Sequence, residues 1–192
     1  LIISPSTILP STQIRFSKKK FKDYNIDICI SDDINFPPNK ISDYDIVIFQ
    51  RTYTPFSYLL FMLAQSLNKL TIYDIDDDLL SSPSCSQLRL TKHDLTTIKN
   101  FLRGAHFVTT TTELLKNKLT AYSENIHVLK NSLPVESFGF KKNISKGKNI
   151  LISNSDYFKL QKSSQYFFSD IEKLLLEDDK IKITLIGSIR GV

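Results

Sequence analysis

The stretch LTIYDIDDDLL, residues 70–80, sets an apolar run directly before a cluster of carboxylates. Residues 70–73 have the length and apolar character of a buried strand. Four aspartates follow within five positions: Asp74, Asp76, Asp77 and Asp78. Charges of one sign this close repel one another, and they lie where the strand is expected to end. The stretch therefore predicts a buried strand whose carboxyl end carries polar chemistry.

Similar apolar runs recur along the chain and alternate with stretches of helical periodicity. This alternation is typical of a parallel sheet covered by helices. We expect strands over residues 1–4, 26–30, 45–49, 70–73, 106–109, 126–129, 149–153 and 181–186. The predicted fold class is α/β: a Rossmann-like parallel sheet with helices on both faces, followed by the beginning of a second Rossmann-like domain.

Four helices are predicted from apolar stripes and end signals. The first follows Thr54, the second runs from Asp94 to Gly104, and the third follows a capping-box pattern of Thr110 and Glu113. The first stripe comprises Leu59, Leu60, Met62, Leu63 and Leu67, and the fourth helix carries Phe167, Ile171, Leu174 and Leu175. We expect each stripe to be a buried face.

One segment interrupts this pattern. NSLPVESFGFKKNISKGK, residues 131–148, combines mixed polarity, a proline, two glycines and a lysine-rich end, which is typical of an interdomain linker. We therefore predict a first domain over residues 1–136, a linker over 137–148 and a partial second domain over 149–192. About 45 residues are too few to bury an independent core of this type, so we expect the chain to be a fragment of a longer protein.

Composition limits the class of protein. The chain has 192 residues, of which 41% are apolar, which is enough for one substantial core. No run of about 18 apolar residues and no secretory signal pattern occurs, so we expect a soluble, cytoplasmic protein. Cys29 and Cys85 have no metal-ligand spacing and are expected to be free thiols.

The net charge of +5 suggests an anionic partner. The basic residues cluster in KKKFK, residues 18–22, and KKNISKGK, residues 141–148. A solvated lysine-rich face is the favoured interpretation of these clusters, and contact with the inner face of a membrane stays open. Neither cluster carries an aromatic stacking platform or a nucleic-acid motif, so we expect no nucleic-acid partner.

The carboxyl ends of parallel strands meet at one edge of a sheet, where ligands bind. The loops expected at that edge carry Arg15, Arg51, the four aspartates, Thr110 and Asn131. Single aspartates could instead have structural roles. Asp78 could cap a short helix that begins near Leu79, and Asp74 could accept hydrogen bonds from loop amides. Because adjacent ionised carboxylates raise one another's pKa, we expect at least one of them to have an arginine or a ligand hydroxyl as its partner.

Three chemistries use such a cluster. In magnesium-dependent phosphohydrolases of the haloacid-dehalogenase type, an Asp-x-Asp similar to IYDID follows the first strand, whereas here it follows the fourth. In metal-dependent glycosyltransferases an Asp-x-Asp binds the metal, but those enzymes have a single domain. In metal-free transferases with two facing domains, an acidic residue orients or deprotonates an acceptor hydroxyl.

Five segments, taken in chain order, resemble a known family. They are LPSTQIR (residues 9–15), YDIVIFQR (44–51), IYDIDDDLL (72–80), FVTTTTELLKNKL (107–119) and IHVLKNSL (126–133). Together they resemble bacterial glycosyltransferases of the glycosyltransferase-B fold, in the group 1 style, and the resemblance covers nearly the whole chain. It implies transfer of a sugar from a nucleotide-sugar to a glycan or glycoconjugate acceptor in polysaccharide biosynthesis. It implies neither metal nor cofactor, because basic side chains and helix amino termini hold the donor phosphates.

The resemblance also assigns roles to residues. Asp76 and Asp77 are the expected catalytic residues, acting on acceptor hydroxyls. The expected acceptor-binding residues are Arg15, Arg51, Asp78, Thr110 and Asn131; the two arginines either orient the acidic loop or bind an anionic acceptor. Lys159 and Lys162, in a segment similar to the first loop of the donor domain, are expected to approach the donor diphosphate.

The later acidic motif and nucleotide pocket of that family have no counterpart before Val192. We therefore expect the 192-residue chain alone to be inactive and to bind nucleotide-sugars no tighter than roughly millimolar. Two other functions stay open: a non-catalytic α/β binding module, and a magnesium-dependent phosphohydrolase that uses the Asp-x-Asp loop.

Overall fold

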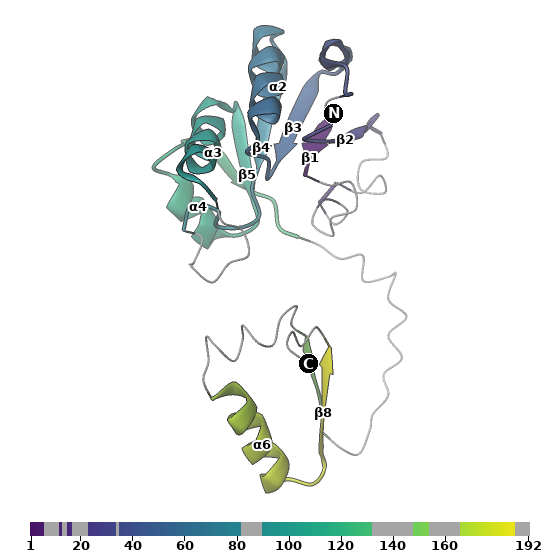
Figure 1. Cartoon of the computed structure of the whole chain (residues 1–192), viewed down its shortest axis with the longest axis vertical. Helices are drawn as coiled ribbons and strands as arrows, with labels where there is room; N and C mark the ends of the chain where they lie inside the picture. Colours follow the sequence, from purple (N-terminus) through teal and green to yellow (C-terminus); the bar gives the residue numbers. More distant parts are fainter. Residues whose placement is uncertain are drawn as a thin grey trace. The chain divides into compact units, whose positions relative to one another are not determined.

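The computed structural model describes residues 1–5, 12, 15–16, 23–33, 35–81, 90–131, 148–153 and 166–186 (Figure 1). The chain divides into two units, Leu1–Val135 and Glu136–Val192. Residues 137–147 of the predicted linker lie outside the described residues, and its last residue, Lys148, opens a strand.

The first unit is built on a six-stranded sheet. Its strands are β1 (Ile2–Ser4), β2 (Ile28–Ile30), β3 (Ile46–Gln50), β4 (Leu70–Asp74), β5 (Phe107–Thr110) and β6 (Ile126–Val128). They lie in the order β2-β1-β3-β4-β5-β6, and every neighbouring pair is parallel. The predicted α/β class is confirmed, and each of these strands lies within two residues of its predicted bounds.

The order of these strands reverses between β1 and β3. A reversal of this kind defines the switch point of a doubly wound sheet, beside which ligands bind. The classical Rossmann order is 3-2-1-4-5-6, whereas only β2 lies beyond β1 among the described strands. Because all six strands are parallel, their carboxyl ends meet at one edge, where Gln50, Asp74 and Thr109 are aligned in register.

Four helical segments of the first unit are described. A short 3₁₀ helix, η1 (Pro38–Asp43), was not predicted; the α-helices are α2 (Pro55–Ser66), α3 (Lys92–Gly104) and α4 (Glu113–Leu119). Helix α2 contacts α3, β3 and β4, and α4 contacts β6. Of the helices that the described ranges contain, none combines the length and the apolar character needed to cross a bilayer.

An aromatic cluster forms the centre of the core. The Tyr73 ring stacks on Phe101 at a centroid distance of 4.8 Å, and Phe49 meets Phe61 edge-on at 5.4 Å. All four side chains are at most 1% exposed, and aromatic pairs stabilise by about 0.5–1.5 kcal/mol beyond their buried area. The cluster fixes β3 and β4 against α2 and α3, and thereby positions the residues that follow these two strands.

The buried face of α2 differs from the prediction. Its buried residues are Ser57, Leu60, Phe61 and Ala64, whose spacing follows one face of a helix. Leu59 and Met62 are 66% and 50% exposed, so their assignment to the buried face was wrong. The helix is apolar on nearly all sides, and an apolar count alone does not identify which side faces the sheet.

The amino termini of α3 and α4 also differ from the prediction. Helix α3 begins two residues before Asp94, because Thr91 and Asp94 form a capping box. The predicted capping box of Thr110 and Glu113 is wrong. Thr110 is still paired with Val128 in the sheet, and the N-cap of α4 is Thr112, whose side chain accepts from the Leu115 amide at 3.2 Å.

The second unit contains β7 (Lys148–Ser153), α6 (Phe167–Glu177) and β8 (Ile181–Ile186). The two strands are parallel and in register along their whole length. No residue of α6 is buried, and Leu174 and Leu175 are 41% and 43% exposed, so their assignment to a core was wrong. The reason is size, since the described part of this unit offers only two strands against which one helix can pack.

Candidate functional site

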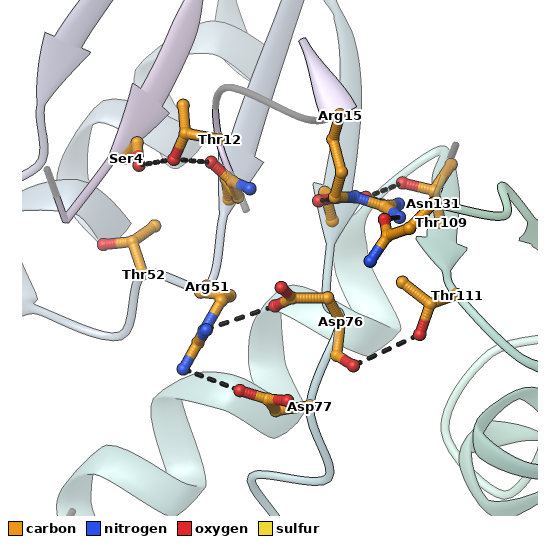
Figure 2. Close-up of polar contacts among 12 residues, drawn as sticks. Ser4, Thr12, Arg15, Arg51, Thr52, Asp76, Asp77, Thr109, Thr111 and Asn131 are labelled. Atoms are coloured by element: carbon orange, nitrogen blue, oxygen red, sulfur yellow. Dashed lines mark hydrogen bonds and ion pairs between the residues drawn. The ribbon is translucent and has the colours of Figure 1, made fainter. Parts of the chain in front are cut away.

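The carboxyl edge of the sheet gathers most of the predicted site residues of the first unit (Figure 2). Backbone hydrogen bonds fix the chain where it leaves the strands. The Arg51 amide donates to the Asp74 carbonyl, and the Ile75 amide donates to the Thr109 carbonyl, both at 2.9 Å. These bonds continue the sheet by one residue and direct the following side chains into two arginine clusters.

The first arginine cluster is buried and centres on Arg15 and Asp74, which are 2% and 0% exposed. Arg15 Nε donates to Asp74 Oδ2 at 2.8 Å, and Nη2 donates to Oδ1, so the pair is bidentate. Asp74 Oδ1 also accepts from the Thr109 hydroxyl at 2.5 Å. The expectation that at least one of the four aspartates has an arginine partner is confirmed, and the expected role of Asp74 as an acceptor for loop amides is not the one observed.

Arg15 also binds the segment that leaves β6. Its Nη1 donates to the Leu129 carbonyl at 2.8 Å and to Asn131 Oδ1 at 3.0 Å. Every nitrogen of the guanidinium is therefore engaged by the protein. Of the two roles considered for Arg15, this geometry favours orientation of the edge over binding of an anionic acceptor.

The second arginine cluster is partly exposed and centres on Arg51. Its Nη2 lies 2.9 Å from Asp77 Oδ2, and its Nε lies 3.3 Å from Asp76 Oδ1. The Arg51 side chain is 20% exposed, against 9% for Asp76 and 60% for Asp77. Arg51 has a φ of 49°, which is uncommon for a residue with a side chain. This left-handed conformation places the guanidinium beside the acidic loop.

Asp76 is the carboxylate with the most unusual surroundings. Its Oδ1 is buried and has no hydrogen-bond donor among the described residues; Arg51 Nε is near enough for an ion pair but is not aligned for a hydrogen bond. Burial raises the pKa of Asp76, and the nearby Asp77 and Asp74 raise it further, while Arg51 acts in the opposite direction. The Thr111 hydroxyl donates to the Asp76 carbonyl at 3.2 Å and holds the loop in place. Asp76 therefore has a buried carboxylate oxygen whose hydrogen-bonding capacity the described residues leave unfilled.

Asp78 belongs to a surface contact. Its Oδ2 lies 2.6 Å from Lys118 Nζ, and its Oδ1 accepts from the Ser81 amide at 3.0 Å. Burial alone would raise the pKa of Asp78, but the bonds from Lys118 and Ser81 outweigh burial and lower it. The aspartate stabilises a turn and caps no helix near Leu79, because residues 79–81 are not helical.

Sequence reasoning missed a chain of polar side chains at the switch point. The Thr12 hydroxyl donates to Gln50 Oε1 at 2.6 Å and lies 3.0 Å from the Ser4 hydroxyl. Gln50 Nε2 and the Thr110 hydroxyl oxygen are buried and have no hydrogen-bond partner in the part of the chain that the structure describes. The signal available in the sequence was Gln50 itself, a polar residue that ends an otherwise apolar strand.

The remaining predicted residues are not located. Lys159 and Lys162 lie outside the described residues, so their proposed contact with a donor stays a prediction. Within the described ranges, no group of three or more histidine, cysteine, aspartate or glutamate side chains is arranged to hold a metal ion.

The carboxyl edge thus combines a buried, fully bonded ion pair with a neighbouring carboxylate, one oxygen of which lacks a hydrogen-bond donor among the described residues. This arrangement can hold a loop in place and accept a hydrogen bond from a hydroxyl group. No protein-family model matches the chain, and neither a curated protein nor a solved structure is significantly similar to it.

Proposed function

We propose that the chain is part of a metal-independent glycosyltransferase with two Rossmann-like domains, of the glycosyltransferase-B type. It transfers a sugar from a nucleotide-sugar to a hydroxyl group of a glycan or glycoconjugate acceptor. The observation that carries the proposal is the Asp76 carboxylate at the carboxyl edge: nine-tenths buried, with a raised pKa and one oxygen without a hydrogen-bond donor among the described residues.

The proposed chemistry requires a base beside the acceptor. The acceptor hydroxyl donates to Asp76 Oδ1 and attacks the anomeric carbon of the donor. The new glycosidic bond forms as the bond to the diphosphate breaks, and the hydroxyl proton passes to the carboxylate. A general base works best when its pKa is near the working pH, and burial moves Asp76 in that direction. Asp77 accepts from a neighbouring hydroxyl, and Arg51 keeps the two carboxylates in place.

The state of Asp74 disfavours the two Asp-x-Asp chemistries. A magnesium ligand or a phosphoryl acceptor needs a carboxylate oxygen that is open to the substrate. Both oxygens of Asp74 are bound to Arg15, and the residue is completely buried. The proposal therefore excludes Asp74 from the reacting groups and rests on Asp76.

The donor is assigned to the second unit by resemblance. Lys159 and Lys162 would approach the diphosphate, and basic side chains are the usual partners of diphosphates in metal-free sites. The acceptor is assigned to the first unit, because the carboxyl edge described above belongs to it. Because the donor and the acceptor are assigned to different units, sugar transfer should be measured with the protein produced from its natural reading frame.

Replacement of Asp76 tests the proposal. In the protein produced from its natural reading frame, Asp76→Asn should lower the turnover of sugar transfer by about 10²–10⁴-fold, which is the usual contribution of a general base. The measurement is diphosphate release from a panel of uridine-, guanosine- and thymidine-diphosphate sugars. Asp43→Asn is the matched control, because Asp43 is exposed at the end of η1, ahead of the amino end of β3, and should leave turnover unchanged.

Other outcomes would contradict the proposal in different ways. Unchanged transfer by Asp76→Asn, together with a melting temperature several degrees lower, would make the acidic loop purely structural. A phosphatase activity that needs added magnesium and disappears in chelator would favour the phosphohydrolase. Binding of sugars without transfer from any donor would favour a non-catalytic binding module.

A further inference from the structure

The loops that follow β3 and β4 carry more negative than positive charge. Residues 51–54 and 75–81 contain one cation, Arg51, and three carboxylates, Asp76, Asp77 and Asp78. Lys118 reaches this region from α4 and compensates Asp78. Among the described residues, the cluster of Arg51, Asp76 and Asp77 thus contains one positive charge and two negative charges.

Arg51 is already paired with two carboxylates, although its third guanidinium nitrogen, Nη1, has no partner among the described residues. Its Nη2 is held by Asp77 at 2.9 Å, and its Nε lies beside Asp76 at 3.3 Å. A phosphate or carboxylate that approached Nη1 would lie close to the negative charges of both Asp76 and Asp77. Lys130, an exposed cation that follows β6, is separated from β4 by β5, so two strand spacings of about 5 Å each lie between them. Ionic screening at this distance makes Lys130 a weak substitute.

The unfilled hydrogen-bonding capacity of Asp76 Oδ1 limits which chemical groups of a ligand can bind there. Asp76 Oδ1 belongs to a side chain that is 9% exposed, and it lacks a hydrogen-bond donor among the described residues. A buried carboxylate oxygen is stabilised by a donor, and leaving it without one is unfavourable. A sugar hydroxyl supplies an O–H group, whereas a carboxylate or a fully ionised phosphate supplies none.

We infer that the group bound at the Asp76–Asp77 loop is a neutral polyhydroxyl group, such as an unmodified sugar ring, and that acceptors with a phosphate or carboxylate next to the reacting hydroxyl are excluded. The inference rests on the proposed function and narrows its acceptor. One ring hydroxyl donates to Asp76 Oδ1, and a neighbouring hydroxyl donates to Asp77. Arg51 serves as the counter-ion of the loop and does not contact the acceptor through a charge pair.

Anion exclusion is tested without any transfer reaction. The probe is inorganic phosphate, titrated into the ¹⁵N-labelled chain while the Arg51 Nε–H signal and the amide signals of residues 75–78 are followed by NMR. The wild type should show no saturable shift at these signals. Asp77→Asn releases Arg51 Nη2 and should bind phosphate at least about tenfold more tightly than the wild type, since one charge within a few ångströms is removed.

The variant is expected to fold, because Asp77 is 60% exposed. Asp43→Asn is the control for a general loss of negative charge and should behave as the wild type. A saturable phosphate shift in the wild type, as strong as in Asp77→Asn, would overturn the inference. A saturable response of residues 75–78 to magnesium chloride would also overturn it, because it would identify a cation as the ligand.

A paired-acceptor experiment then tests the substrate class. Each pair consists of a methyl glycoside and its uronate or 6-phosphate, offered to the protein produced from its natural reading frame. The neutral member of each pair should have a kcat/KM at least about tenfold higher than the anionic member. In Asp77→Asn this ratio of the two kcat/KM values should fall by about tenfold. Preference for the anionic member overturns the inference and leaves the proposed function intact. If no acceptor of any pair receives a sugar, both the proposed function and the assignment of the acceptor are wrong. The NMR titration with phosphate does not depend on transfer, so it still tests whether the loop excludes anions.

Discussion

The two arginine clusters use the same types of side chain under different conditions. Arg15 and Asp74 are almost completely buried, and every guanidinium nitrogen and both carboxylate oxygens have partners. Arg51 and its two aspartates lie at the same edge but remain partly exposed, and one oxygen of Asp76 has no donor among the described residues. The hydrogen-bonding capacity of the two side chains is thus filled in the first cluster and only partly filled in the second.

The difference follows from where the partners come from. Arg15 bonds to Asp74 at the end of β4 and to the exit of β6, and Thr109 of β5 bonds to the same Asp74 carboxylate. Within the described part of the chain, the Arg51 side chain pairs only with the loop that follows the neighbouring strand β4. Enclosure removes water and fixes one geometry, whereas a contact between two loops leaves its side chains partly exposed to solvent.

The buried cluster should respond most strongly to loss of charge. Asp74→Asn keeps the shape of the side chain but leaves Arg15 as an uncompensated buried charge, so the free energy of unfolding should fall by about 3–5 kcal/mol. Urea denaturation followed by circular dichroism measures the change. If the free energy of unfolding fell by less than about 1 kcal/mol, the Arg15–Asp74 pair would contribute no more than a surface ion pair does. The two arginine clusters would then not differ in their contribution to stability.

The partly exposed cluster offers a comparison of two substitutions at one position. Arg51→Gln removes the ion pairs and keeps a strained left-handed residue, whereas Arg51→Gly removes the ion pairs and relieves the strain. Arg51→Gly should therefore be more stable than Arg51→Gln by about 1 kcal/mol in the same denaturation experiment. Equal stability of the two variants would show that the positive φ carries no strain.

The surface pair of Asp78 and Lys118 should respond least among the ion pairs. The Lys118 side chain is 50% exposed, so Asp78→Asn should reduce the free energy of unfolding by about 0–1 kcal/mol. Part of this loss comes from the weaker hydrogen bond that an amide accepts from the Ser81 amide. Raising the salt concentration to about 1 M should reduce the effect, because exposed charges are screened. A loss comparable with that of Asp74→Asn would be unexpected.

The pH dependence of stability should have opposite signs at Asp76 and Asp78. Burial raises the pKa of Asp76, so the folded chain binds more protons there, and its stability relative to Asp76→Asn should fall as the pH rises from about 4 through the raised pKa. The bonds from Lys118 and Ser81 outweigh burial and lower the pKa of Asp78. Its contribution is therefore present above about pH 4 and is lost as the pH falls through the folded pKa. Unfolding curves at several pH values distinguish the two slopes, and slopes of the same sign would contradict these assignments.

Much of the first unit was predictable because its strands are local features. An apolar run such as residues 70–73 predicts a strand wherever it occurs, and a polar residue at its end predicts the edge. The parallel arrangement followed from the alternation with helices. Helix faces and caps were less predictable. Helix α2 is apolar nearly all round, and four threonines in succession, Thr109 to Thr112, precede α4 and offer alternative N-caps.

The pairing of the arginines was beyond local inference. Arg15 and Asp74 are 59 residues apart, and nothing in the sequence states which of four aspartates an arginine will meet. From the sequence we predicted one shared role for the four aspartates. In the structure Asp74 is buried against Arg15, Asp76 and Asp77 pair with Arg51, and Asp78 contacts Lys118 at the surface. That separation depends on which strand ends lie next to one another, and therefore on the strand order.

The bonds from Arg15 to Leu129 and Asn131 have a consequence for folding. They join residues 114 and 116 positions apart, so they form late in any pathway that builds the sheet from its beginning. During synthesis, Arg15 and Asp74 leave the ribosome well before the segment after β6, and the guanidinium then lacks two of its acceptors. The carboxyl edge consequently reaches its final form only when the last strand of the first unit has docked, which couples maturation of the site to completion of the sheet.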